Sequence, residues 1–139
     1  MDTEPLYRIK ADLFKALAHP VRIQVLEVLA AAEGKATPVS RLAEVTGAEA
    51  SQLSQHLGVL KRTGVVTSLR TGNAVEYRLA EPVVAELLVV ARAFLLGRLT
   101  GHQADAEDRL KAARRLPALP GASARAVLDA SAAKTGDRT

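Results

Sequence analysis

The sequence predicts a mainly α-helical domain with one small β-hairpin, in the order four helices, two strands and a long helix. Three observations support this class. Apolar residues recur at helical spacing over most of residues 6 to 62. Apolar and polar residues then alternate on either side of a Thr71-Gly72-Asn73 turn. Helical character resumes in an apolar run from residue 83 to 99.

The first helix follows an apolar stripe that ends before His19-Pro20: Leu6, Ile9, Leu13, Phe14 and Leu17. Proline suits the first turn of a new helix, because its missing N–H would have no partner there. We therefore expect His19 to cap a second helix, which starts at Pro20 and ends at or just before Gly34.

Thr37-Pro38 repeats this start signal, with Thr37 as the expected N-cap and Pro38 in the first helical position. The third helix is short and stops at Gly47. A fourth helix is predicted from Ala48 to Arg62, with Gly64 as its left-handed cap. Its inward positions are Leu53, Leu57 and Leu60.

The hairpin is predicted from strands over residues 65 to 70 and 74 to 79. The long helix after Glu81-Pro82 is apolar on nearly every side, so it must be buried on more than one face. A domain this small cannot supply that cover, and we expect a second subunit to do so.

The composition changes past Gly101, which predicts a domain over residues 1–100 and an Ala-rich tail over residues 101–139. The stretch from His102 to Arg115 fits one more amphipathic helix, before Pro117 and Pro120 interrupt it. The remainder has few large apolar residues and is expected to be weakly ordered or disordered.

The totals exclude several classes of function. The 139 residues carry a formal charge of +4, with 3% aromatics and no cysteine. Disulfides, thiolate nucleophiles and thiolate metal sites are therefore excluded, and a stacking platform for single strands is disfavoured. The N-terminus holds no secretory apolar core, and Glu86, Arg92 and Arg98 argue against a membrane span. We expect a cytoplasmic protein with no membrane partner.

The third and fourth helices have helix-turn-helix proportions, and the hairpin makes the arrangement a winged helix-turn-helix. The outer face of the fourth helix is hydrogen-bonding and carries no fixed charge: Ser51, Gln52, Ser54, Gln55 and His56. Glutamine can make two bonds to adenine, and serine can bond a base edge or a phosphate, so this face suits the major groove of double-stranded DNA. A solvated outer face without a partner is the alternative, and for His56 so is a contact with a neighbouring helix.

Basic residues that flank this face are expected to contact phosphates: Lys61, Arg62, Arg70 and Arg78. Thr37, Ser40 and Asn73 complete the predicted DNA-binding set, while Arg22 and Arg41 are weaker candidates.

Taken together, the chain resembles the ArsR/SmtB family of transcriptional regulators over about residues 6 to 98. The segments that carry the resemblance are Leu13–Arg22, Ser51–Leu60, Gly64–Val66, Arg70–Asn73 and Tyr77–Leu79. The resemblance implies a homodimer built on the first and last long helices, with two recognition helices in successive major grooves, and a repressor released from DNA by an inducer. The expected interface residues are Leu6, Ile9, Leu13, Val84, Leu87, Leu88, Ala91 and Leu95.

The family's metal-sensing residues do not carry over. Cysteine is absent, and the long helix offers Glu86 but neither Asp nor His, so we expect no metal and no cofactor. His102 with Asp105 is a weak further candidate for metal. The inducing signal stays open between a partner protein that does the sensing and an unknown small-molecule effector.

A protein-docking module and an enzyme are the two other classes of function to consider. A winged helix that docks on a protein should expose large apolar anchors, whereas this face carries Ser, Gln and His. An enzyme is not expected, because there is no Gly-rich phosphate loop and no convincing His–carboxylate arrangement. The operator sequence and the choice between repressor and activator do not follow from the sequence.

Overall fold

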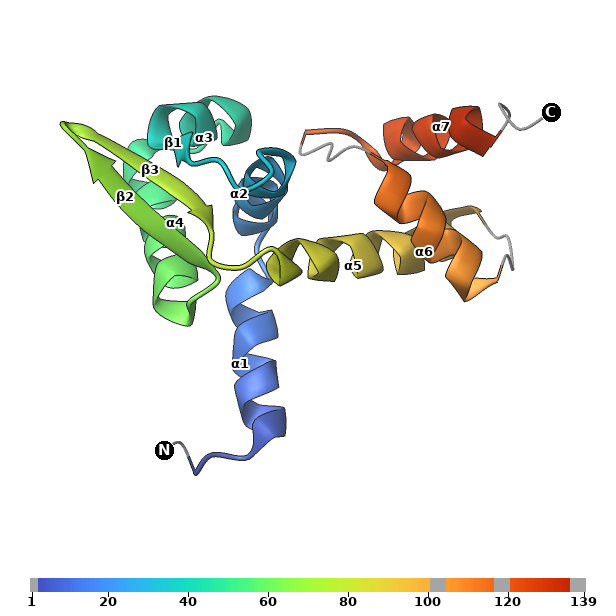
Figure 1. The fold of residues 1–139 in the computed structure, drawn as a ribbon, viewed down its shortest axis with the longest axis horizontal. Helices are drawn as coiled ribbons and strands as arrows, with labels where there is room; N and C mark the ends of the chain where they lie inside the picture. The colour runs from blue at the N-terminus through green and yellow to red at the C-terminus, as the bar shows by residue number, and fades with distance from the viewer. Residues whose placement is uncertain (1–2, 101–104, 117–120, 136–139) are drawn as a thin grey trace.

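The computed structural model describes residues 3–100, 105–116 and 121–135. Figure 1 shows α4 and the β-hairpin at one end, α1 projecting away from the body, and α5 running out toward α6 and α7. The elements are α1 (Leu6–Leu17), α2 (Pro20–Ala31), β1 (Thr37–Pro38), α3 (Val39–Thr46), α4 (Ala50–Thr63), β2 (Val66–Thr71), β3 (Ala74–Leu79), α5 (Val83–Thr100), α6 (Ala106–Arg115) and α7 (Ala124–Thr135).

The predicted order of helices and hairpin is confirmed, and so are several local signals. His19 caps α2, since its Nδ1 accepts a hydrogen bond from the Val21 N–H at 3.1 Å. Gly47 and Gly64 end α3 and α4 in the left-handed region, with φ of 65° and 84°. Each of these features depends on neighbours within a few residues along the chain.

The predicted N-cap role of Thr37 is wrong. Thr37 and Pro38 form β1, which pairs antiparallel with β3 and places Thr37 opposite Tyr77. The sheet therefore has three strands in the order β1-β3-β2. The Thr37 side chain is buried, and α3 begins only at Val39 with no side-chain cap. Pairing with a distant strand and burial of a β-branched side chain outweigh the local capping preference.

The main core is aliphatic, as the scarcity of aromatic residues requires. The three predicted inward leucines of α4 are buried within it. Its buried members come from α1, α2, α3, α4, the hairpin and α5: Leu17, Val25, Leu26, Val28, Leu29, Leu42, Leu53, Leu57, Leu60, Val65, Val66 and Leu88. This core fixes α4 by one face and leaves its opposite face free.

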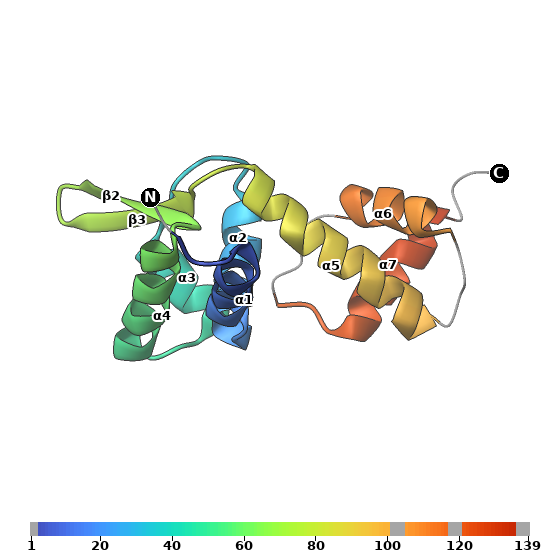
Figure 2. The same cartoon turned by 90° about the horizontal axis from the view of Figure 1, so that it is seen from below.

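Two helices lie in the region that the sequence assigned to a tail. Helix α6 falls within the predicted stretch, whereas α7 occupies residues for which we expected weak order. Both gather around the C-terminal half of α5 (Figure 2). They share a second apolar cluster with α5, whose buried members are Ala93, Leu96, Ala113 and Leu116. The division of the chain at residue 100 stays a prediction.

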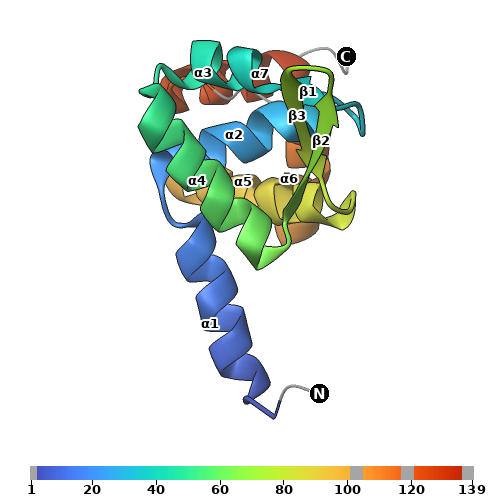
Figure 3. The same cartoon turned by 90° about the vertical axis from the view of Figure 1, so that its left-hand side faces the viewer.

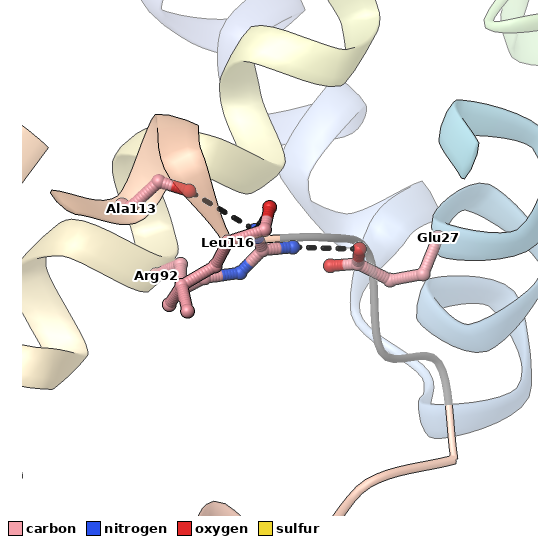
Figure 4. A network of polar contacts seen from close by, with 4 residues as sticks. All are labelled: Glu27, Arg92, Ala113 and Leu116. Carbon is pink, nitrogen blue, oxygen red and sulfur yellow. Dashed lines mark hydrogen bonds and ion pairs between the residues drawn. The ribbon is translucent and has the colours of Figure 1, made fainter. Parts of the chain in front are cut away.

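An arginine of α5 ties α6 to α2. The Arg92 guanidinium lies 2.9 Å from a carboxylate oxygen of Glu27, and it also donates to the carbonyls of Ala113 and Leu116 at 3.3 and 3.5 Å (Figure 4). Both charged side chains are mostly buried, at 15% and 16% exposed. Burial raises the pKa of the Glu27 carboxyl, and the attraction of Arg92 offsets that rise only in part.

We predict that Arg92→Leu lowers the free energy of unfolding by about 1–3 kcal/mol, because it leaves the Glu27 carboxylate and the α6 carbonyls without their donor. Urea unfolding at neutral pH measures the change. Arg114→Leu is the matched control: it removes an equally close ion pair with Glu86, but one whose side chains are 50% and 44% exposed. Its expected cost is below about 1 kcal/mol. Equal losses in the two variants would contradict the role assigned to Arg92.

Candidate nucleic-acid interface

Helices α3 and α4 form a helix-turn-helix unit at the end of the molecule that carries the hairpin. Gly47 adopts a φ of 65° between them, which redirects the chain at little steric cost. Figure 3 faces α4 directly and shows the β2–β3 hairpin beside it, with α2 and α5 behind. The outer face of α4 and the hairpin therefore point to the same side of the molecule.

Four of the five predicted base-reading side chains are exposed on this outer face: Ser51, Gln52, Ser54 and Gln55. Within the described residues, no hydrogen bond engages the amides of Gln52 and Gln55. The Ser51 hydroxyl donates to a carboxylate oxygen of Glu49 at 3.1 Å, which is an exposed contact that water or a ligand can replace. The glutamine amides are free to bond a base edge.

The fifth residue, His56, is half-buried against a neighbouring helix. Its Nδ1 accepts a hydrogen bond of 3.1 Å from Arg22 Nε, and its ring centroid lies 4.1 Å from that of His19. Of the contacts considered from the sequence, the neighbouring-helix contact is present. Burial lowers the pKa of the His56 imidazole, with smaller contributions from His19 and Arg22.

Sequence reasoning missed this cluster. Arg22 and His56 are separated by 34 positions, and no local spacing predicts a contact over that distance. Arg22 also donates to the Ala16 carbonyl at 2.8 Å, so two of its guanidinium nitrogens already have hydrogen-bond acceptors within the protein. These contacts make a phosphate contact by Arg22 less favourable than the sequence suggested.

The predicted phosphate-binding residues fall on three parts of this side. Lys61 and Arg62 are exposed in the last turn of α4, and Ser40 is exposed in the first turn of α3. Arg41 is exposed as well but pairs with Glu44 at 3.5 Å. Thr37 leaves the predicted set, since its buried side chain cannot reach a ligand.

On the hairpin, Arg70, Asn73 and Arg78 are all exposed. Arg70 pairs with Val75, whereas Arg78 pairs with Thr67. Since side chains alternate along a strand, Arg70 shares a face with buried Val66, and Arg78 lies on the opposite face. Arg70 is therefore on the hairpin face that turns toward the rest of the fold, and the two arginines cannot make the same contact.

A second surface is apolar and lies between α1 and α5. A groove of about 700 Å³ is lined there by Leu13, Phe14, Val65, Val83, Val84, Glu86, Leu87, Val90, Ala91 and Phe94. The exposed fractions of apolar side chains on these two helices are high, at 64% for Leu6 and 68% for Tyr7 on α1 and 59% for Phe94 on α5. Exposed apolar side chains that gather along one groove mark an interaction site.

Most of the predicted dimer residues lie on this apolar surface. Leu6, Ile9, Leu87, Ala91 and Leu95 are exposed, while Leu13 and Val84 are half-buried and line the groove. Leu88 is 8% exposed and belongs to the core, so it leaves the predicted interface. The sequence interpretation did not include Tyr7, Phe14, Val90 and Phe94. Helical spacing from Leu6 could have added Phe14, and helical spacing from Leu87 could have added Val90 and Phe94.

Two further expectations concern metals and membranes. Within the described residues, no three His, Asp or Glu side chains come together as a metal site would require. His102 lies outside the described residues, and Asp105 caps α6 by accepting from the Glu107 N–H. No helix in the described ranges is long and apolar enough to cross a membrane.

Comparison with known proteins identifies the kind of molecule. A family model described as a helix-turn-helix domain matches residues 17–68. The uncharacterized HTH-type transcriptional regulator Rv0081 of Mycobacterium tuberculosis is 49% identical over 108 residues, which cover 78% of this chain and 93% of that protein. The biofilm growth-associated repressor of Xylella fastidiosa is 38% identical over 78 residues, covering 56% and 66%.

Solved structures agree with these relatives. The crystal structure of Rv0081 aligns with a TM-score of 0.64 at 48% identity, over 73% of this chain and all of that one. A homodimeric winged helix-turn-helix DNA-binding domain, Mb0332 of Mycobacterium bovis, described as a possible ArsR-family regulator, aligns with a TM-score of 0.62 at 29% identity, covering 76% and 99%. These relatives are described as a transcriptional regulator and a DNA-binding domain.

The His56 cluster predicts a dependence of stability on pH. Because the pKa of His56 is lower in the folded chain than in the unfolded one, the folded state resists protonation. Its contribution is complete above the unfolded pKa of about 6.5 and is lost as the pH falls through the lower folded value. We expect the free energy of unfolding of the wild type to fall more steeply on acidification than that of His56→Gln. Chemical unfolding at a series of pH values measures both slopes.

Unfolding measurements of the wild type and His56→Gln at alkaline pH provide the control. Above about pH 8 the imidazole is neutral in both states, so the difference between the two proteins should become constant there. Parallel curves across the acidic range would show that folding does not lower the pKa of this histidine.

Proposed function

The chain belongs to the ArsR/SmtB family of winged helix-turn-helix transcriptional regulators, and we propose that it represses transcription by binding an inverted-repeat operator as a homodimer. One observation carries the proposal. The uncharged hydrogen-bonding face of α4 is exposed beside a basic hairpin, on the side away from the core. Since its proposed partner is DNA, we propose that the protein acts in the cytoplasm, as the sequence predicts.

Base recognition is assigned to the exposed face of α4. Gln52 and Gln55 offer free amides that can donate to and accept from a base edge in the major groove, while Ser51 and Ser54 are short enough to let the helix approach closely. Lys61 and Arg62 at the end of the helix are placed for phosphates, where cations hold the register without reading sequence.

The hairpin is assigned to the flanking backbone. Arg70 and Asn73 lie near its tip, beyond the part that packs on the core. Arg70 shares the hairpin face that is directed toward the fold, so it is the better placed of the two hairpin arginines to meet a duplex held against α4. Arg78 is expected to contribute less.

The apolar surface of α1 and α5 is assigned to the second subunit. Helix α1 projects from the body with Leu6 and Tyr7 exposed near its start, an arrangement that is unfavourable in water for an isolated chain. A two-fold interface would cover the same residues on both copies. It would also present two α4 helices to half-sites about one helical turn, roughly 34–36 Å, apart. Support comes from the related Mb0332 domain, which is described as homodimeric.

We predict that Gln55→Ala and Arg70→Ala weaken DNA binding in different ways. Gln55→Ala should lose about 1–3 kcal/mol on the preferred duplex and relax the preference at one base position. Arg70→Ala should weaken all duplexes alike and reduce the slope of log K against log salt by about 1. Fluorescence anisotropy over a salt series measures both, with a duplex enriched by the wild type from a random library.

Arg78→Ala is the matched control for the hairpin, since it removes an exposed arginine from the opposite face. Its loss should be smaller than that of Arg70→Ala. Failure of the wild type to enrich any sequence over random duplex at physiological salt would refute the proposed function.

We further predict that Phe94→Glu abolishes both dimer formation and tight operator binding. The change places a charge on the exposed apolar surface, where burial against a second copy would require its desolvation. Analytical ultracentrifugation should show a monomer at concentrations where the wild type is a dimer. Ala126→Glu, which adds the same charge on an exposed site of α7, should leave the dimer intact. A dimeric Phe94→Glu variant would exclude this surface as the interface.

A further inference from the structure

His56 lies where α4 meets the corner between α1 and α2. Its Nδ1 accepts from Arg22 Nε at 3.1 Å, and its ring lies tilted by 38° against that of His19. Arg22 is itself held by the Ala16 carbonyl at the end of α1, at 2.8 Å. His19 is held in the same way, because its Nδ1 accepts from the Val21 N–H at 3.1 Å. Every group of the cluster that touches His56 is therefore anchored.

These hydrogen bonds fix where the imidazole proton resides. A neutral imidazole has one N–H donor and one acceptor nitrogen, and the nitrogen that accepts cannot also carry the proton. Since Nδ1 of His56 accepts from Arg22, its proton is on Nε2. The same reasoning places the His19 proton on Nε2. The Nε2–H of His56 is the part of the ring left for an outside partner.

The positive charge of Arg22 maintains this state. Among the described residues, Arg92 and Arg114 each pair with a carboxylate, but no carboxylate pairs with Arg22. Protonation of His56 would require displacing the Arg22 donor and would place two cations together. Burial lowers the pKa of His56, and the charges of His19 and Arg22 lower it further. No other titratable residue occurs between Glu49 and Lys61 on its own helix.

We propose that Arg22 and His19 are positioning residues, which hold His56 as a neutral side chain that can only donate, through Nε2–H, to an acceptor atom of duplex DNA. The inference rests on the proposed function and assigns a chemistry to one residue of it. The acceptor is either a phosphate oxygen or an acceptor on a base edge, such as guanine O6 or N7 or thymine O4. Donor groups such as the cytosine amine are rejected.

Two substitutions of His56 separate the two ring nitrogens. Glutamine places an amide N–H₂ near the position of Nε2 and keeps the outward donor. Asparagine places its amide near Nδ1, where it can still meet Arg22, but leaves nothing at Nε2. We expect His56→Gln to bind the enriched duplex within about threefold of the wild type and His56→Asn to lose about tenfold or more.

The positioning role is read out by NMR. In the wild type, long-range ¹H–¹⁵N correlation should show His56 as the Nε2–H tautomer, and Arg22→Gln should shift it toward a mixture of tautomers while the backbone spectrum stays dispersed. Arg22→Gln should also lose about tenfold in affinity. Arg125→Gln, which alters an exposed arginine paired with Asp129 on α7, is the control and should change neither measurement.

The two sources of acceptor give different patterns in the same experiment. A phosphate contact predicts that His56→Asn loses the same factor on enriched and on random duplex, whereas a base contact predicts a loss on the enriched duplex alone. Equal affinities for His56→Gln and His56→Asn, or a wild-type Nδ1–H tautomer, would overturn the positioning proposal while leaving DNA binding intact. Absence of any preferred duplex for the wild type would instead overturn the proposed function, and this inference with it.

Discussion

The architecture depends on one constraint, which is that α5 is apolar on nearly every side and must be covered on more than one face. Leu88 faces the main core, and Ala93 and Leu96 face α6 and α7. The remaining side, which includes Val90 and Phe94, is exposed in the single chain. Folding satisfies two of the three sides, so a second copy is the simplest way to satisfy the third, and the DNA-binding geometry follows from how that copy is placed.

The sequence was most informative where the physical cause is local. Helix caps at His19, Gly47 and Gly64 follow from neighbouring residues, and the leucine spacing of α4 fixes which face is buried. The role of Thr37 was wrong because its partner, Tyr77, lies 40 positions away in β3 and strand pairing outweighs capping. The contact between Arg22 and His56 was missed for the same reason. Non-local pairing leaves no periodic signal in a single sequence.

The C-terminal region shows a different limit. Past Arg115 its composition, rich in alanine and poor in large apolar residues, predicted weak order because each side chain buries little area, whereas α6 falls in the stretch predicted to be helical. Alanine is also the best helix former, and small residues let α6 approach α5 closely. Ala113 is completely buried at that contact. The carbonyls at the end of α6 then find a donor in Arg92, a charged residue of an otherwise apolar helix. The amino-acid composition indicates how much apolar area a segment can bury, but it does not reveal that Arg92 donates to these carbonyls.

The cluster at His56 joins two parts of the molecule that the proposed function needs to keep in register. A single guanidinium, that of Arg22, donates to the last turn of α1 through the Ala16 carbonyl and to α4 through His56. Helix α1 carries part of the proposed dimer surface, and α4 carries the proposed reading face. A rotation of α1 relative to α4 would therefore strain or break one of these two hydrogen bonds. Because a guanidinium is planar and its donors diverge at fixed angles, Arg22 transmits orientation as well as attraction. A lysine at this position could supply the charge but could not fix both directions at once.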